Sequence, residues 1–172
     1  MIYKDSLLDS FRNAFPLSPI PSSVIGSAYS DEELKDINAI LGLSWDEIDT
    51  EFIESYWGEV ALLSPRAFEY YLPGFCSAVV ERDDYESSIF NCFFSTFDGI
   101  EKKGKISKYD YERWGALNLN QYDVLLRFFE YFDHKIRRKK NINSSCFKEY
   151  TRSLQHCIKW IDALSCRKID IY

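Results

Sequence analysis

The stretch Ser64-Pro-Arg-Ala-Phe-Glu-Tyr-Tyr-Leu-Pro73 carries the clearest helix-start signal of the chain and decides the fold class. Ser64 can accept a hydrogen bond from the first turn, and Pro65 occupies the first helical position, where a missing N–H costs nothing. Apolar residues follow at helical spacing on both sides of Pro73, at Ala67, Phe68, Tyr71, Leu72, Phe75, Cys76, Val79 and Val80. The pattern predicts a helix that starts at Pro65 and kinks or breaks at Pro73.

Helical spacing recurs on both sides of this stretch. Upstream, Ser30 and Glu33 have the spacing of a capping box at the start of a helix, and Gly42 can end that helix. Ser44 and Glu47 have the same capping-box spacing before a short turn at 45–48. Further helices are expected over 6–15, 31–41, 51–63, 85–97, 107–114, 118–136 and 145–164. No segment alternates with the period of a strand. The sequence therefore predicts an all-α fold in which residues 1–172 form a single compact domain of about six to eight helices.

Two segments are expected to lack helix. Three prolines fall within 16–21, so 16–29 is predicted to be an extended connector rich in Pro and Ser. Two glycines flank a run of charged residues at 99–106, which is predicted to be a charged loop.

The composition supports a folded helical domain. The chain has 172 residues and a mass of 20.3 kDa, and 46 % of its residues are hydrophobic, including 13 Phe, 12 Tyr and 4 Trp. Intrinsic disorder is excluded as the default state, because such a chain has ample apolar mass to bury. Its 7 Gly and 5 Pro are too few for a many-stranded barrel or an enzyme built on glycine-rich loops.

The sequence also predicts a cytoplasmic protein. Met1-Ile-Tyr-Lys-Asp5 has no signal-peptide pattern, and no window approaches the roughly 18 apolar residues of a membrane span. The five cysteines are irregularly spaced without a C-x-x-C pair, as in proteins that keep free thiols in a reducing compartment. His156 and Cys157 are adjacent, but neighbours on a helix point about 100° apart and cannot easily act on one atom.

Several of these residues carry a family resemblance. The motif Leu62-Leu-Ser-Pro-x-Ala-Phe-x-Tyr-Tyr-Leu-Pro73-x-Phe75, with Trp45-x3-Asp49 before it and Leu119-x-Gln121 and Phe128-Phe-x-Tyr131 after it, resembles a family of small bacterial helical domains of unknown function. The resemblance covers roughly residues 20–135 and implies a helical fold and a bacterial source, but no activity. The basic segment at 99–105 and the last helix depart from the family pattern.

No motif predicts a cofactor, a metal site or catalysis. Gly99-x4-Gly104-Lys105 approaches a phosphate-binding loop, but Ile106 stands where a Ser or Thr must reach the metal ion. His134 and His156, the two histidines of the sequence, lack the spacing of a metal site. Carboxylates are plentiful, so an unrecognised enzyme with a carboxylate site stays an alternative to the expected non-enzymatic protein.

Charge is distributed very unevenly along the chain. Residues 1–100 contain 18 acidic and 5 basic side chains, a net charge of −13, whereas residues 101–172 contain 9 acidic and 16 basic ones, a net charge of +7. Within 31–59 there are ten acidic residues and a single basic one, Lys35. Such a surface attracts cationic partners and repels nucleic acid. The acids can equally well be helix-start residues that pair with the basic segment 135–140 inside the fold.

These features predict an immunity protein that binds and neutralises a bacterial toxin, as in contact-dependent growth inhibition. A nuclease with a cationic cleft is the expected partner, because an acidic face can occupy that cleft as phosphates would. The predicted partner-binding residues are Trp45, Asp46, Glu47, Asp49, Glu51 and Glu54, with Trp45, Tyr56 and Trp57 as aromatic anchors. The main alternative is a nucleic-acid-binding accessory protein that uses Lys102, Lys103, Lys105 and 135–140, although an isoelectric point near 5.0 opposes it.

Overall fold

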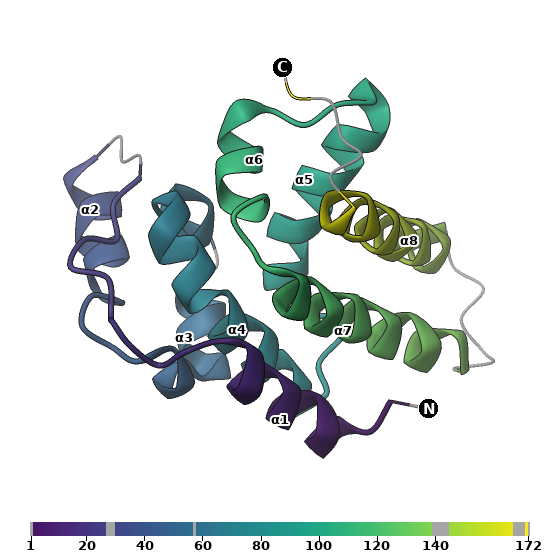
Figure 1. The fold of residues 1–172 in the computed structure, drawn as a ribbon, viewed down its shortest axis with the longest axis horizontal. Helices are drawn as coiled ribbons and strands as arrows, with labels where there is room; N and C mark the ends of the chain where they lie inside the picture. Colours follow the sequence, from purple (N-terminus) through teal and green to yellow (C-terminus); the bar gives the residue numbers. More distant parts are fainter. Residues whose placement is uncertain (1, 27–29, 57, 139–144, 167–170, 172) are drawn as a thin grey trace.

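The computed structural model describes residues 2–26, 30–56, 58–138, 145–166 and 171, and the described residues form an all-α domain (Figure 1). Its α-helices are α1 (Lys4–Ala14), α2 (Asp31–Asn38), α3 (Thr50–Tyr56), α4 (Pro65–Arg82), α5 (Ile89–Lys103), α6 (Lys108–Trp114), α7 (Leu119–Arg138) and α8 (Ser145–Ser165). Two 3₁₀ helices, η1 (Trp45–Glu47) and η2 (Glu59–Leu62), flank α3. The described strand pairing is limited to isolated bridges, Ile25 with Leu63 and Ile106 with Ile171. The prediction of an all-α fold is confirmed.

Helix α4 is the centre of the fold and packs against α1, α3, α6 and η1. It begins as the sequence predicts, because Oγ of Ser64 accepts the backbone N–H of Ala67 at 3.3 Å and Pro65 follows at the first position. Of the two outcomes predicted at Pro73, a kink or a break, the break is excluded, since α4 runs unbroken to Arg82. Pro73 and its neighbours are buried, and this burial outweighs the roughly 3 kcal/mol that an interior proline costs a helix.

An aromatic core joins α5, α7 and α8 on the other side of α4. Phe90 of α5 lies 5.7 Å from Phe128 and 5.1 Å from Phe132 of α7, centroid to centroid, and 5.8 Å from Tyr150 of α8. Phe128 also contacts Phe11 of α1 at 6.1 Å. These ring contacts hold the first and the last helices on one core.

The predicted charged loop at 99–106 is wrong over its first part. Helix α5 continues through Gly99 to Lys103 and ends at Gly104, whose φ of 70° is left-handed and whose N–H donates to the carbonyl of Ile100 at 2.7 Å. The last turn stays helical because Ile100 is buried against the core, while Lys102 and Lys103 are exposed.

Three other boundaries differ from the sequence expectation. The helix expected over 51–63 is split into α3 and η2 around Gly58. The helix expected from 85 begins at Ile89, and α2 ends at Asn38, before the turns that contain Gly42. In each case the helical spacing of apolar residues continues beyond the helix into a turn, because apolar residues of the turn are also buried in the core. The spacing alone therefore predicts a helix that is too long.

The predicted connector contains no helix over its described part, residues 16–26, and residues 27–29 lie outside the described chain. It is bound to the start of α4, because the N–H of Gly26 donates to the carbonyl of Leu62 and the N–H of Ser64 to the carbonyl of Val24, both at 2.9 Å. Val24 is fully buried between these bonds. The connector is therefore part of the packed structure that surrounds α4.

Candidate functional site

Trp45 is part of the core and does not lie on the surface. Its side chain is only 2 % exposed, and its Nε1 donates to the carbonyl of Pro16 at 3.2 Å. Its backbone crosses α4 so closely that a Cβ atom at Gly74 would lie 2.2 Å from the Trp45 carbonyl oxygen. The prediction of an exposed Trp45 anchor is wrong, because the indole is buried where η1 crosses α4. Tyr56 is half-buried, and Trp57 lies outside the described residues.

The five predicted carboxylates, Asp46, Glu47, Asp49, Glu51 and Glu54, are all exposed, and we call them the acidic group. Two of them also fix the local backbone. Oε2 of Glu47 accepts the N–H of Ser44 at 2.6 Å, which completes the predicted capping box, and Oδ1 of Asp49 accepts the N–H of Phe52 at 2.8 Å at the start of α3. These bonds hold both carboxylates in fixed positions at the surface.

Glu54 is bonded to the start of α5, whereas Asp46 and Glu51 are not bonded to any described side chain. Oε1 and Oε2 of Glu54 accept the hydroxyls of Ser87 at 3.0 Å and Ser88 at 3.2 Å. A carboxylate at this place is also favoured by the partial positive charge of the α5 N-terminus. Asp46 and Glu51 therefore have the most freedom to pair with a partner's cation.

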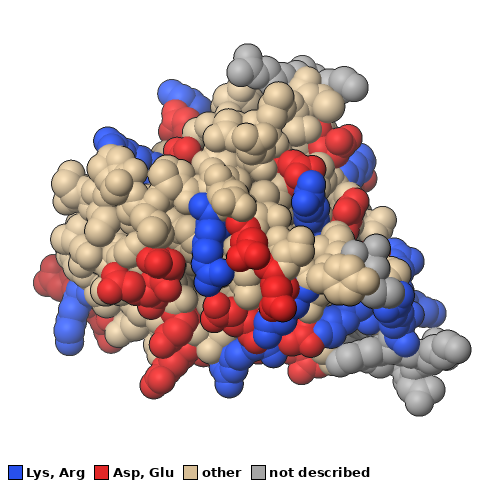
Figure 2. All heavy atoms as spheres, turned by 60° about the horizontal axis from the view of Figure 1, so that its bottom comes forward, with Lys and Arg blue, Asp and Glu red and all other residues tan. Residues whose placement is uncertain are grey.

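The acidic group has no cationic partner within the described chain. The eight ion pairs of the described residues all use other carboxylates. The alternative that the basic segment neutralises these acids is wrong for its described cations, because Lys135 pairs with Asp83 and Arg137 pairs with Asp133 at 2.8 Å. Residues 139 and 140 lie outside the described chain. Figure 2 shows basic side chains gathered at the lower right of the drawn face, and acidic and basic side chains intermixed over the rest of it.

Further acids lie near the acidic group, because α2 packs against η2, the 3₁₀ helix that follows α3. Asp36 of α2 lines a shallow gap together with Phe52 and Tyr56 of α3. Asp31 and Glu32, in the first turn of α2, are exposed. The negative charge of the segment 31–56 is thus spread over two neighbouring helices and the 3₁₀ turn between them.

The sequence analysis missed a row of polar contacts between α5 and α8. Asp98 of α5 contacts Nδ1 of His156 at 2.6 Å and accepts the hydroxyl of Ser153 at 2.7 Å, and one turn further Glu101 accepts Nζ of Lys159 at 2.6 Å and Nε1 of Trp160 at 2.9 Å. The spacing of three residues between Asp98 and Glu101, repeated on α8, is the signal that could have indicated this row.

This row has the composition of a nucleophilic site but not its arrangement. A serine nucleophile is hydrogen-bonded to the histidine that acts as its base. Ser153 instead donates to Asp98, and no hydrogen bond to His156 is described. Burial, with the nearby Asp98, raises the pKa of the Cys157 thiol well above its ordinary value, so Cys157 stays protonated. The row therefore serves to join α5 to α8.

We expect the Glu101 contact to make stability depend on acid pH. The hydrogen bond from Lys159 lowers the pKa of Glu101 below its ordinary value of 4.5, and the Trp160 bond adds to this effect. Because the pKa of Glu101 is lower in the folded state than in the unfolded state, its contact with Lys159 stabilises the fold fully above about pH 4.5. This stabilisation is lost as the pH falls through the lowered pKa. Glu101→Gln should therefore cost under about 1 kcal/mol at pH 7, since the pair is partly exposed, and less at pH 3.

Urea unfolding at both pH values measures this difference. Glu130→Gln is the control, because Glu130 is exposed and makes no ion pair with a described residue. An equal cost of Glu101→Gln at both pH values would contradict the assignment.

No group of three or more His, Cys, Asp and Glu side chains within the described chain is arranged to hold a metal ion. No helix of the described chain combines the length and the apolar character needed to cross a membrane.

Comparison with known proteins identifies the family but no function. A model of a family of unknown function, DUF6714, matches residues 27–159. No curated protein and no solved structure gives a significant match. The matched range contains α2 to α7 and most of α8, and it therefore includes the acidic group. Because the match covers more than half of the chain, the protein belongs to this family of unknown function, DUF6714.

Proposed function

We propose that the protein is a cytoplasmic immunity protein, which binds and neutralises a cationic bacterial toxin without catalysing a reaction. The observation that carries the proposal is the acidic group, whose five exposed carboxylates have no cationic partner within the described chain. Carboxylates without a cation among the described residues are available to pair with a partner. The negative potential that they produce increases the rate of encounter with a basic protein.

The structure of the acidic group suits a rigid docking surface. Glu47 and Asp49 are held by bonds to the backbone, and Glu54 is held by the turn before α5. Less conformational freedom is then lost when these carboxylates bind, which favours affinity. Asp46 and Glu51, which have no described side-chain partner, would form new charge pairs with the toxin.

A nuclease is the toxin class that best fits this surface. Nuclease clefts are basic because they bind phosphates, and spaced carboxylates on a rigid helix and turn can take the positions of those phosphates. Because Trp45 is buried in the core, any aromatic contact with the toxin must come from another residue. Charge therefore supplies most of the recognition in this proposal.

The test is co-expression and affinity measurement with the product of the adjacent reading frame. The double variant Asp46→Asn/Glu51→Gln should weaken the complex about tenfold at low salt, because two charge pairs of up to about 1 kcal/mol each are lost, mainly through slower association. Its free energy of unfolding should change by less than about 0.5 kcal/mol, since neither side chain has a described partner.

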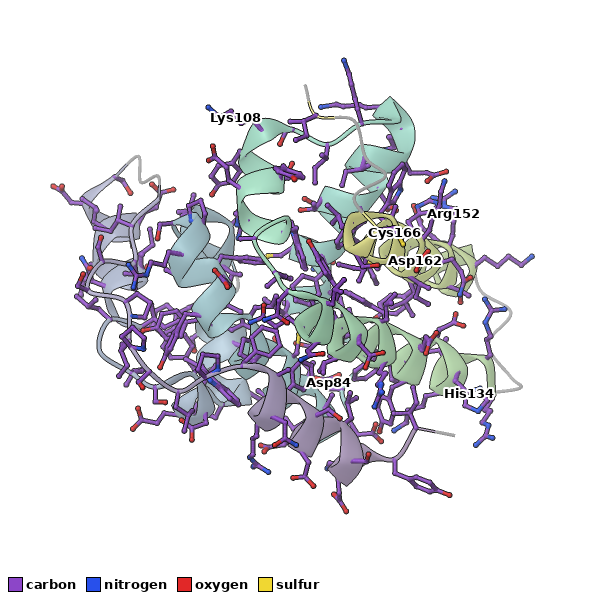
Figure 3. All side chains as sticks on the ribbon, in the orientation of Figure 1. Asp84, Lys108, His134, Arg152, Asp162 and Cys166 are labelled. Carbon is purple, nitrogen blue, oxygen red and sulfur yellow. The ribbon has the colours of Figure 1, made fainter. Side chains whose placement is uncertain are left out.

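The matched control is Glu130→Gln/Asp162→Asn, which removes the same charge from exposed positions elsewhere. Asp162 lies on α8, well away from α3 (Figure 3). This control should leave the affinity within about twofold. Equal weakening by both double variants would show that only net charge matters, and absence of a complex would refute the proposal.

A further inference from the structure

The gap between α2 and α3 adjoins the helix that carries part of the acidic group. Its buried lining includes Ile37 and Phe75, which belong to the core, whereas Asp36, Phe52 and Tyr56 are half-buried. The gap has a volume of about 10 Å³, close to the least that one water molecule needs. A partner's side chain can therefore lie across the gap but cannot enter it.

The rings of Phe52 and Tyr56 form a contacting pair on one side of α3. Their centroids are 4.8 Å apart and their planes are tilted by 42°. Residues four positions apart on a helix are neighbours on its surface, which is why these two rings meet. Because both side chains are only half-buried, part of the pair faces solvent. Exposed aromatic side chains of this kind, tyrosine above all, often supply much of the binding energy of a protein interface.

Carboxylates accompany the ring pair. Asp36 lines the same gap, and Oδ1 of Asp49 accepts the N–H of Phe52 at 2.8 Å. Asp36 takes part in none of the eight ion pairs of the described residues. Lys35, the single basic residue within 31–59, is exposed and is not among the described residues that line the gap. The gap therefore combines aromatic surface with negative charge.

This combination selects a planar cation. The face of an aromatic ring attracts a cation electrostatically, and arginine makes such contacts more often than lysine. A guanidinium group can stack on a ring and donate two parallel hydrogen bonds to a carboxylate, whereas an ammonium group is a compact and strongly hydrated charge. Arginine therefore matches both the ring pair and the carboxylate of Asp36.

We propose that Asp36, Phe52 and Tyr56 form the contact for an arginine side chain of a basic partner protein. The guanidinium group lies across the gap, stacked on Tyr56 and hydrogen-bonded to Asp36. The inference rests on the proposed function, because it takes the partner to be a basic protein. It keeps Tyr56 as an anchor and adds two residues that the sequence analysis did not name as binding residues, while buried Trp45 has no part in it.

The test compares two peptides of equal charge, tetra-arginine and tetralysine. Each is titrated at low salt into the whole protein, whose tyrosine rings are labelled with ¹³C. The ring signals of Tyr56, assigned by their loss in Tyr56→Phe, should shift in a saturable manner with tetra-arginine. The Kd of tetra-arginine should be at least about threefold lower than that of tetralysine, because only the guanidinium group both stacks and pairs.

Three variants locate the contact. Tyr56→Leu keeps an apolar side chain at the gap but removes the ring, so the preference for tetra-arginine should disappear. Asp36→Asn should weaken tetra-arginine binding at least about twofold, and it tests the same contact without altering a ring if Tyr56→Leu does not fold. The control is Tyr3→Leu, which removes a tyrosine that is 68 % exposed before α1 and should leave the preference unchanged.

These results separate the arginine contact from the proposed function. Equal binding of the two peptides, no saturable shift of the Tyr56 signals up to about 20 mM, or an unchanged preference in Tyr56→Leu would overturn the inference. A toxin complex together with any of these results would leave the proposed function standing without the arginine contact. A clear preference for tetra-arginine without a toxin complex would support the contact and refute the proposed function.

Discussion

Replacing Gly74 with alanine should destabilise the protein by about 3 kcal/mol or more, although alanine favours a helix over glycine by about 1 kcal/mol. The reason is the crossing of η1 over α4, where a Cβ atom at position 74 would lie 2.2 Å from the carbonyl oxygen of Trp45 and 3.0 Å from Cβ of Ile48. A backbone oxygen in a buried turn cannot rotate away as a side chain can. Urea unfolding followed by circular dichroism measures the loss.

Gly99 of α5 provides the matched control for this prediction. It also lies inside a helix, but a Cβ atom there would meet nothing within 4 Å. Gly99→Ala should therefore stabilise the protein by about 0.5–1 kcal/mol. A similar effect of both substitutions would show that α4 and η1 can separate at little cost.

Trp45→Ala should cost about 3–5 kcal/mol, because it removes a large aromatic side chain from the core and leaves a cavity. The same change also removes the bond from Nε1 to the Pro16 carbonyl. Trp45→Phe keeps most of the buried ring and should cost about 1–2 kcal/mol less than the alanine change, again measured by urea unfolding.

This pair of variants also separates stability from partner binding. With 2 % of its side chain exposed, Trp45 cannot contact a partner directly, so a folded Trp45→Phe protein should bind the proposed toxin as the unchanged protein does. Normal folding of Trp45→Phe together with loss of toxin binding would instead restore Trp45 as a binding residue.

The helix starts could be predicted from the sequence because their causes are local. The side chains of Ser30, Ser64 and Ser107 each accept the N–H of the residue three positions on, at 3.1, 3.3 and 3.1 Å, as their spacing indicates. The capping box of Ser44 and Glu47 is confirmed in the same way. A few neighbouring residues determine each of these features, so no knowledge of the rest of the fold is needed.

The burial of Trp45 could not be predicted, because it depends on residues far away along the chain. Its indole donates to Pro16, and its backbone approaches Gly74, so both contacts are set by the path of the connector and by α4. The end of α5 could not be predicted for the same reason. Gly99 looks like the end of a helix in the sequence, and only the burial of Ile100 in the folded core shows that the helix continues. The exposure of the five carboxylates could be predicted because charged side chains are seldom buried alone.

The acidic group also imposes a thermodynamic penalty on the free protein. Because the described residues supply no cation to these five carboxylates, their mutual repulsion raises the free energy of the native state. Dissolved salt relieves that repulsion in the unbound protein, yet it screens the attraction to a basic partner. Ionic strength therefore acts with opposite sign on the folding equilibrium and on the association equilibrium of the same surface.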